Sequence, residues 1–274
     1  MAGTTLEKLS EELIFALDIC DQISSVAMSH YRDGVEAVEK PDGSPVTEAD
    51  KQCEKLIRQA IAQRYPADGI LGEEEGETAG SATAGKGTKG SQQSGSRRWI
   101  IDPIDGTYGF IRGSAVWSTL LALEDDGEIV LGVVSAPAAG DTYWAEKGRG
   151  AYKNGIRIHV SKFDDLSKSQ FEFGGLSRIL QKGLWKGFSK VVEKTARQRG
   201  FGDYLGFAHV FEGKAEAHLE VGVHPWDVAP MKILAEEAGG RYSDLSGGAS
   251  IYTGSCLVTN GILHDQVLNL LLSK

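Results

Sequence analysis

Two aspartates, Asp102 and Asp105, end an apolar run in the stretch WIIDPIDGTYGF, residues 99–110. Pro103 disfavours a helix at the residue before it and fixes a bend, so both carboxylates and the carbonyl of Ile104 can turn towards one point. Carboxylates this close raise each other's pKa unless a cation lies between them, and Mg²⁺ suits such an oxygen-only set. The stretch therefore predicts a magnesium site. The alternative is that the aspartates only form turns, because Asp-Pro and Asp-Gly are common turn pairs.

Two further acidic sites also lie at the ends of predicted elements. The stretch GEEEG follows a short apolar strand and supplies Glu73 and Glu74, and PWDVAP places Asp227 at the start of a helix. A single aspartate there is explained by the helix dipole alone. Three acidic sites at strand or helix ends, none with a basic neighbour in the sequence, favour a shared metal site over three unrelated turns.

Gly106 and Thr107, directly after the aspartates, add the features of an anion site. Glycine lets a ligand approach the backbone closely, and the threonine offers a hydroxyl and an N–H group. If a helical turn follows, its first N–H groups point at the same place as the carboxylates. A phosphate bound there would bridge the anion site and the metal site.

The composition limits the partners that this chain can have. Its net charge is −9 over 274 residues, which argues against nucleic acid but not against a small phosphorylated substrate held by a metal ion. Three scattered cysteines without a CxxC spacing fit a reducing compartment. The start of the chain does not resemble a signal peptide, and no apolar run reaches the length of a membrane span, so we expect a cytoplasmic protein without a membrane partner.

Apolar residues at helical spacing predict several helices. Thr4 and Glu7 are placed as a capping box for the first, and Thr47 with Asp50 three residues later opens the second, which runs to about Arg64. Further helices are predicted over 183–198, from Trp226 with Gly239 as a C-terminal cap, and over 262–274.

Strand-like segments, bounded by Gly, Pro and Asp, are predicted at 99–102, 115–123, 128–136, 142–146 and 150–153. Residues 76–98 contain no large apolar residue, so we expect a flexible insertion without fold information. The pattern indicates an α+β or layered α/β fold in a single unit, 1–274, with a change near residue 155.

The stretches GEEEG, WIIDPIDGTYGF and PWDVAPMKILAEEAGG resemble the signatures of the inositol monophosphatase family of Mg²⁺-dependent phosphomonoesterases. The resemblance covers the chain apart from the 76–98 insertion. It implies an αβαβα sandwich, a homodimer and two or three Mg²⁺ ions. It also implies that the metal and water-activating motifs lie in an N-terminal half, 1–155, and the substrate segment and last metal ligand in a C-terminal half, 156–274.

The resemblance also implies a role for each matching residue. The metal ligands would be Glu73, Asp102, the Ile104 carbonyl, Asp105 and Asp227. Asp50 and Thr107 would position and activate the attacking water, with Glu73 counted among the catalytic residues, and Gly106 and Thr107 would bind phosphate. Lys40 falls where the family often has a lysine on a mobile loop, and a solvated loop lysine is the equal alternative.

The segment 197–220 bears on the choice of phosphate ester. Asp203 adds a carboxylate where many inositol phosphatases have a small polar or apolar pair, and Glu220 is a second carboxylate near the predicted pocket. A cationic substrate would explain both, and the stretch RGFGDYLGF is similar to the histidinol-phosphate phosphatases of this superfamily. We therefore expect hydrolysis of L-histidinol phosphate to L-histidinol and phosphate, a step of histidine biosynthesis.

Three alternatives stay open. Glu220 also suits hydroxyl-rich substrates, so an inositol-1-monophosphatase or a broad sugar-phosphate phosphatase is the second interpretation. Asp203 could be only a turn residue after Gly202. A non-catalytic metal- or phosphate-binding module is the third, although such a module would be free to lose the water-activating pair Asp50 and Thr107.

Overall fold

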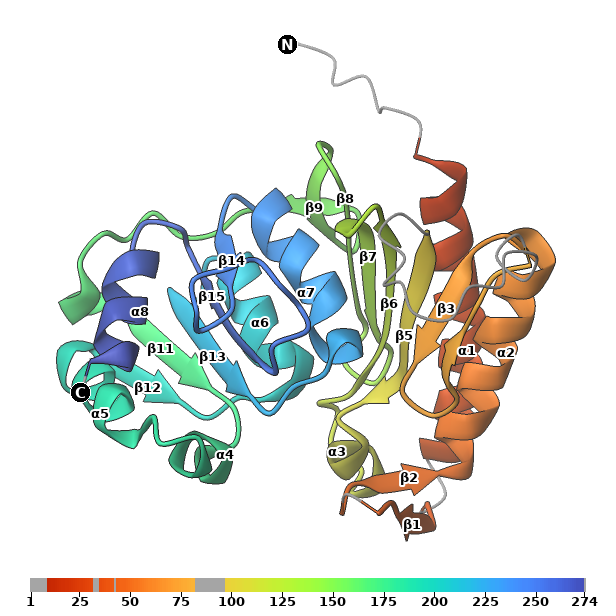
Figure 1. Cartoon of the computed structure of the whole chain (residues 1–274), viewed down its shortest axis with the longest axis horizontal. Coiled ribbons are helices and arrows are strands. Elements are labelled where there is room, and N and C mark those ends of the chain that lie inside the picture. The colour runs from red at the N-terminus through yellow and green to blue at the C-terminus, as the bar shows by residue number, and fades with distance from the viewer. Residues whose placement is uncertain (1–8, 32–34, 42, 82–96, 274) are drawn as a thin grey trace, which may run out of the picture.

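The chain folds into five layers in which helices and sheets alternate, as the resemblance implies (Figure 1). The structure, a computed structural model, describes residues 9–31, 35–41, 43–81 and 97–273. Three apolar cores lie between successive layers. None of the helices in these ranges is long and apolar enough to cross a membrane.

The outer layer of the N-terminal half consists of α1 (Glu11–Tyr31) and α2 (Glu48–Arg64), which pack on one face of the larger sheet. In α2 the side chain of Thr47 accepts from the backbone N–H of Asp50, whose carboxylate accepts from the backbone N–H of Thr47, so the predicted cap is confirmed. The Ser10 hydroxyl accepts from Leu13 N–H at the start of α1. The cap predicted at Thr4 and Glu7 lies outside the described residues.

The larger sheet has eight strands in the order β10-β9-β8-β7-β6-β5-β3-β4. Its strands β3 and β5 run parallel, with Gly72 opposite Ile101, so the residues that follow these strands meet at one edge. The bounds are β3 (Gly69–Gly72), β4 (Gly76–Thr78), β5 (Arg98–Asp105), β6 (Ser118–Asp125), β7 (Glu128–Ala136), β8 (Asp141–Glu146), β9 (Gly150–Lys153) and β10 (Ile156–Ile158).

The expected insertion at 76–98 is too wide at both ends. Gly76–Thr78 forms β4, which pairs with β3, and Arg98 is the first residue of β5. Short polar strands of this kind have no apolar alternation, so only the neighbouring strand identifies them. Residues 82–96 lie outside the described residues.

The smaller sheet has five strands in the order β12-β11-β13-β15-β14 and forms the C-terminal half. The chain passes from one sheet to the other between Ile158 and Gln170. The predicted helix over 183–198 is too long, because Arg197–Arg199 pairs with β11 as a strand. The bounds are β11 (Gln170–Phe173), β12 (Arg197–Arg199), β13 (Ala217–Val221), β14 (Arg241–Ser243) and β15 (Ser255–Thr259).

Helices α6 (Asp203–Phe211) and α7 (Pro225–Glu237) fill the layer between the sheets (Figure 1). Gly132 of β7 allows α7 to approach closely, because a Cβ there would lie 2.8 Å from the Cα of Pro230. Gly239 follows α7 with φ of 90°, as predicted for its cap. The outer face of the smaller sheet is covered by α4 (Leu176–Gln181), α5 (Trp185–Lys194) and α8 (His264–Leu272).

Three short elements complete the fold. A hairpin of β1 (Ala37–Glu39) and β2 (Pro45–Thr47) precedes α2, the helical turn α3 (Thr107–Ile111) follows β5, and a 3₁₀ turn, η1 (Leu166–Lys168), precedes β11.

Arg98, inside the segment expected to be an insertion, joins the two halves. Its Nε donates to Glu124 Oε2 over 2.6 Å, and its Nη2 donates to the hydroxyl of Tyr252 over 2.6 Å. Tyr252, from the C-terminal half, also lies 2.8 Å from both carboxylate oxygens of Glu124. Because Glu124 is only 4% exposed, its charge depends on these partners.

We expect Arg98→Met to lower the free energy of unfolding by about 2 kcal/mol, because the buried Glu124 carboxylate loses its cation. Urea denaturation measures the change. Arg64→Met is the matched control: its ion pair with Glu11 is more than half exposed on both sides and should contribute about 0.5 kcal/mol or less. Equal losses in the two variants would contradict the assigned role of Arg98.

Candidate active site

A cavity of about 800 Å³ lies where the ends of β3 and β5 meet the smaller sheet and the first turns of α3, α6 and α7. It brings together residues from both halves of the chain. Of the predicted site residues, the cavity is lined by Glu73, Asp102, Ile104, Asp105, Gly106, Thr107, Asp203, Glu220 and Asp227. The remaining one, Asp50, lies behind Thr107, whose Oγ1 is 3.4 Å from Asp50 Oδ1.

The aspartates of β5 are fixed by backbone donors. Oδ1 of Asp102 accepts from Ile104 N–H over 3.1 Å, which turns the chain within the bulge that interrupts pairing between Asp102 and Asp105. Oδ2 of Asp105 accepts from Tyr204 N–H, in the first turn of α6, over 3.0 Å. The carboxyl group of Asp105 thus ties β5 to the C-terminal half.

Asp227 approaches from α7. Its Oδ2 accepts from the backbone N–H of His224 over 2.7 Å, which completes a capping box. The helix dipole favours a negative charge in this first turn. The third predicted acidic site therefore meets the first two through the fold, although it is more than 120 residues away in the sequence.

Burial and mutual repulsion raise the pKa of these carboxyl groups. The pKa of Asp102 is raised well above its usual value by burial, then by Glu73, Asp105 and Asp227. Burial, then Asp203 and Asp227, raise the pKa of Asp105 in the same way. Burial raises the pKa of Asp227 to about 7. A cation among these groups would remove the repulsion that the shifts reflect.

Lys40 places a positive charge directly beside the carboxylate of Glu73. Its Nζ donates to Glu73 Oε1 over 2.8 Å and to Glu74 Oε1 over 2.6 Å. Burial lowers the pKa of Lys40, but the hydrogen bonds to Glu73 and Glu74 outweigh it and raise the pKa. The alternative of a solvated loop lysine is therefore wrong for this structure, since the side chain is only 17% exposed.

The oxygen atoms of these carboxyl groups and of the Ile104 carbonyl are the kind of ligand that a hard divalent cation prefers. They are not yet arranged around a common point. Among the residues that the structure describes, no three His, Cys, Asp or Glu side chains already converge as metal ligands. Glu73 faces Lys40, and the three aspartates each accept from a backbone N–H. A metal ion bound to Glu73 would lie close to the ammonium group of Lys40, which contacts one oxygen of that carboxylate.

Gly106 is required by its surroundings. Its φ of 81° is left-handed, and a Cβ would lie 3.0 Å from the carbonyl oxygen of Val116 and 3.3 Å from the carboxyl group of Asp203. A glycine here lets the backbone after β5 pass close to Val116 and Asp203 while it lines the cavity.

Thr107 and Asp50 form a hydroxyl–carboxyl pair. The Thr107 hydroxyl lies 3.0 Å from the Ile104 carbonyl and 3.4 Å from Asp50 Oδ1. Oδ2 of Asp50 is held by the N–H and the hydroxyl of Thr47, at 2.8 and 2.5 Å. Burial raises the pKa of Asp50, although the hydrogen bonds from Thr47 oppose the shift. The pair has the arrangement needed to orient a water molecule.

Asp203 and Glu220 form a second acidic pair in the same cavity. Asp203 has φ of 53°, an uncommon conformation for a residue with a side chain. Burial, then the charge of Glu220, raises the pKa of Asp203 to about 6. Glu220 is packed so closely against Gly174 that a Cβ there would lie 2.0 Å from a carboxylate oxygen. The buried His218 places Nε2 3.5 Å from Glu220 Oε1.

Sequence reasoning missed Arg178, which lines the cavity. Its side chain lies across Gly222, where a Cβ would come within 3.0 Å of Arg178 Cδ, and its Nη1 donates to the Gly222 carbonyl over 3.4 Å. Its positive charge lowers the pKa of Asp203 and Asp227 against the larger effect of burial. The glycine pair in the stretch GGLSRIL is the only local feature of the sequence that points to a close contact near Arg178. It does not indicate which group Arg178 contacts.

Comparison with known proteins gives one consistent result. The sequence model described as the inositol monophosphatase family matches residues 8–273. The histidinol-phosphatase of Mycobacterium tuberculosis is 38% identical over 264 residues, covering 94% of this chain and 96% of that protein. The fructose-1,6-bisphosphatase/inositol-1-monophosphatase of Thermotoga maritima is 33% identical over 262 residues, 94% of each chain.

Among solved structures, the IMPase of Thermotoga maritima superposes with a TM-score of 0.80 at 32% identity, covering 96% of this chain and 97% of that one. Together with the layered fold and the acidic cavity, these matches define a phosphoric monoester hydrolase. The chain belongs to the inositol monophosphatase family, whose members are generally metal-dependent.

The raised pKa values predict how stability depends on pH. An unfolded aspartate titrates near 4, but folded Asp227 titrates near 7, so the folded state binds more protons between these values. The free energy of unfolding contributed by this group therefore falls as pH rises from about 4 to about 7.

In the presence of a chelator, we expect Asp227→Asn to remove part of this fall, and Mg²⁺ to oppose it in the parent chain. Urea denaturation between about pH 5 and about pH 7.5 measures both effects. Asp164→Asn, at an exposed position, is the control and should keep the parent's slope. If the free energy of unfolding of Asp227→Asn depends on pH as steeply as that of the parent, protonation of Asp227 does not contribute to stability.

Proposed function

We propose that this chain hydrolyses L-histidinol phosphate to L-histidinol and phosphate, using two or three Mg²⁺ ions. The proposal depends chiefly on one observation: the Asp203–Glu220 pair lies in the same cavity as the metal-type carboxylates and beside Gly106. A substrate whose phosphate lies at Gly106 would direct its remaining groups towards two carboxylates.

The proposed Mg²⁺ ligands come from three elements that the fold brings together. They are Glu73, Asp102, the carbonyl of Ile104, Asp105 and Asp227. When bound there, the ions would lower the pKa of a coordinated water and neutralise charge on the phosphoryl oxygens. We assign Gly106 and Thr107 to the phosphate oxygens through their backbone N–H groups.

Asp50 and Thr107 orient the attacking water. The Thr107 hydroxyl accepts a hydrogen bond from the water once its own proton turns from the Ile104 carbonyl, 3.0 Å away, towards Asp50 Oδ1, 3.4 Å away. The two hydrogen bonds from Thr47 hold Asp50 in place. Attack of the water oxygen on phosphorus forms the new P–O bond and breaks the ester P–O bond. One proton of the water stays on the released phosphate, and the leaving alcohol takes up the other. No covalent intermediate with the chain is needed.

Selectivity for a cationic substrate follows from the charges around the leaving group. Histidinol phosphate has an amino group and an imidazole ring, and both can donate charge-assisted hydrogen bonds to carboxylates. The 38% identity to a histidinol-phosphatase supports this choice. The 33% identity to a fructose-1,6-bisphosphatase/inositol-1-monophosphatase keeps a polyol phosphate as the alternative, because carboxylates also accept hydrogen bonds from hydroxyl groups.

The first test is phosphate release, with Mg²⁺ or with a chelator, from histidinol phosphate, inositol 1-phosphate, fructose bisphosphate and adenosine bisphosphate. We expect Mg²⁺-dependent release with a strong preference for histidinol phosphate. Preference for inositol 1-phosphate would agree with the proposed Mg²⁺-dependent hydrolysis but contradict the proposal that histidinol phosphate is the substrate. Mg²⁺ binding without release from any ester would favour the non-catalytic module.

Asp105→Asn should lower kcat by about 100-fold or more, because the position loses its negative charge for the metal. The amide oxygen can still accept from Tyr204 N–H, so circular dichroism should show an intact fold. Asp164→Asn, exposed and outside the cavity, is the matched control. Full turnover by Asp105→Asn would refute the metal assignment.

Asp203→Asn tests the proposal that Asp203 binds a cationic group of the substrate. Asparagine tolerates the positive φ at this position, so the backbone is retained while the charge is lost. A lost charged hydrogen bond should raise KM for histidinol phosphate by about 10- to 100-fold and leave KM for inositol 1-phosphate nearly unchanged. Equal increases for both substrates would assign Asp203 to the structure of the turn.

A further inference from the structure

Glu54 is a buried glutamate of α2 that lies outside the cavity but contacts the turn that presents Glu73. It follows Asp50 by one helical turn and has no exposed surface. Its Oε2 accepts from Glu74 N–H over 2.7 Å, and its Oε1 accepts from Glu75 N–H over 3.0 Å. The two residues directly after Glu73 are therefore held by one side chain of α2.

Arg58, one turn further along α2, extends this contact. Its Nε donates to Glu54 Oε1 over 2.7 Å, its Nη2 donates to the carbonyl of Gly76, and its Nη1 donates to Thr78 Oγ1 over 3.1 Å. Glu54 and Arg58, which we call the α2 clamp, thus bind the turn from residue 74 to residue 78.

The α2 clamp also touches the chain on the other side of Glu73. A Cβ at Gly72 would lie 2.2 Å from Glu54 Oε1 and 2.7 Å from Arg58 Nη2. Only a glycine leaves room for the clamp there. The residues before and after Glu73 are both fixed against α2, and the side chain of Glu73 is left facing the cavity.

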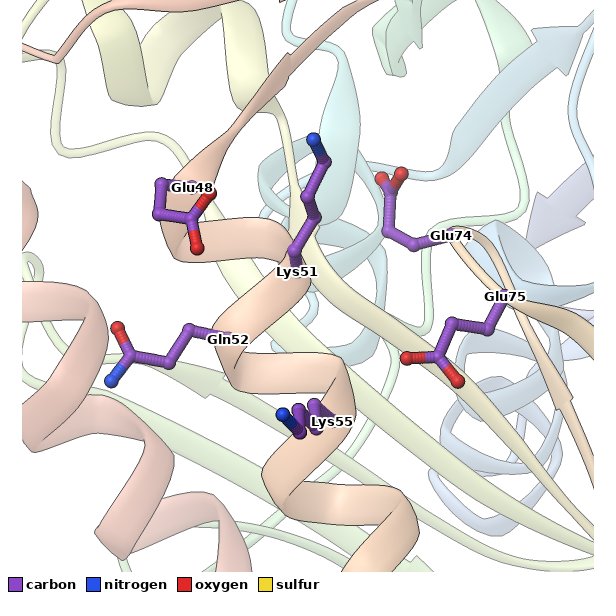
Figure 2. A pocket seen from close by; sticks show the side chains of 6 residues that line it. All are labelled: Glu48, Lys51, Gln52, Lys55, Glu74 and Glu75. Carbon is purple, nitrogen blue, oxygen red and sulfur yellow. The ribbon is translucent and has the colours of Figure 1, made fainter.

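The outer side of this junction is a shallow groove of about 370 Å³ with charged walls (Figure 2). Figure 2 shows Glu74 and Glu75 leaving the turn beside α2, with Lys51 and Lys55 on the adjacent surface of the helix. Lys51, Lys55 and Glu75 are exposed to solvent, so their charges contribute little to positioning. The position of the turn depends instead on the buried clamp.

We propose that Glu54 is a positioning residue that fixes Glu73 relative to Asp50. Helix α2 then carries the water-orienting carboxylate of Asp50 directly and sets the place of a metal ligand through Glu54. This inference rests on the proposed assignment of Glu73 to Mg²⁺.

The role requires a carboxylate and not only a polar side chain. Glu54 accepts from two backbone N–H groups and from Arg58, all of which are donors. Glutamine has a single acceptor oxygen and an NH₂ group that would face one of these donors. A buried donor without a partner moves towards water, which would displace the turn and Glu73 with it.

The experiment compares Mg²⁺ binding to the full chain without substrate, by isothermal titration calorimetry, in Glu54→Gln and the parent. We expect the Kd to rise by about 10- to 100-fold, as for other groups that orient metal ligands. Hydrogen exchange at the amides of residues 73–78 should become faster. Glu48→Gln, an exposed glutamate of the same helix, is the matched control and should stay within about twofold of the parent in both measurements.

Two further variants make the result decisive. Gly72→Ala displaces the Glu54 side chain by adding a Cβ next to it. If Glu54→Gln does not fold, the Mg²⁺ affinity of Gly72→Ala tests the positioning role instead. Glu73→Gln shows whether Glu73 binds the metal at all. If Glu73→Gln weakens Mg²⁺ binding and a folded Glu54→Gln does not, the positioning role is overturned and the proposed function stands. If neither weakens it, the metal assignment of Glu73 fails, and this inference fails with it.

Discussion

Repulsion among carboxylates that line one cavity is the constraint on which this structure depends. Asp102, Asp105 and Asp227 lie around one cavity with Glu73 beside them, and burial together with their mutual charge raises the pKa of all three aspartates. A fold selected for stability alone would separate such groups or replace them. The proposed divalent cation would remove this repulsion on binding, which gives a physical reason for such a cluster at the meeting point of two sheets.

The fold holds the three aspartates in place by backbone donors. Asp102 accepts from the next turn of its own strand, Asp105 from the first turn of α6, and Asp227 from the residue before α7. All three donors are backbone N–H groups, which do not titrate. Glu73 differs, because its carboxylate accepts from the ammonium group of Lys40 and also interacts with the side chain of Asp102. Glu73 thus lies between the charge of Lys40 and the carboxyl groups of β5.

Much of the site could be predicted from sequence, because its signals are local. Polar residues directly after an apolar strand identify Asp102 and Asp105, and the Thr47–Asp50 spacing identifies a helix cap. Partners set by strand pairing have no such signal. The strands GET and RQR exist only because neighbouring strands leave an edge for them, and Glu54 and Arg178 acquire their contacts from turns that are distant in the sequence.

The two halves of the chain divide the chemistry unequally. The N-terminal half supplies the anion site and all the proposed metal ligands except Asp227, whereas the C-terminal half supplies Asp203, Glu220 and Arg178. Helix α7 packs closely on β7 through Gly132, and the Asp227 carboxylate accepts from His224 N–H, so neither of these contacts involves Asp203 or Glu220. Asp105 is less independent, because its carboxylate accepts from Tyr204 N–H, directly after Asp203, and because burial and then the charge of Asp203 raise its pKa. The pair proposed to face the substrate is therefore coupled to one of the proposed metal ligands, and a substitution at Asp203 must keep the backbone of the first turn of α6 to leave Asp105 in place.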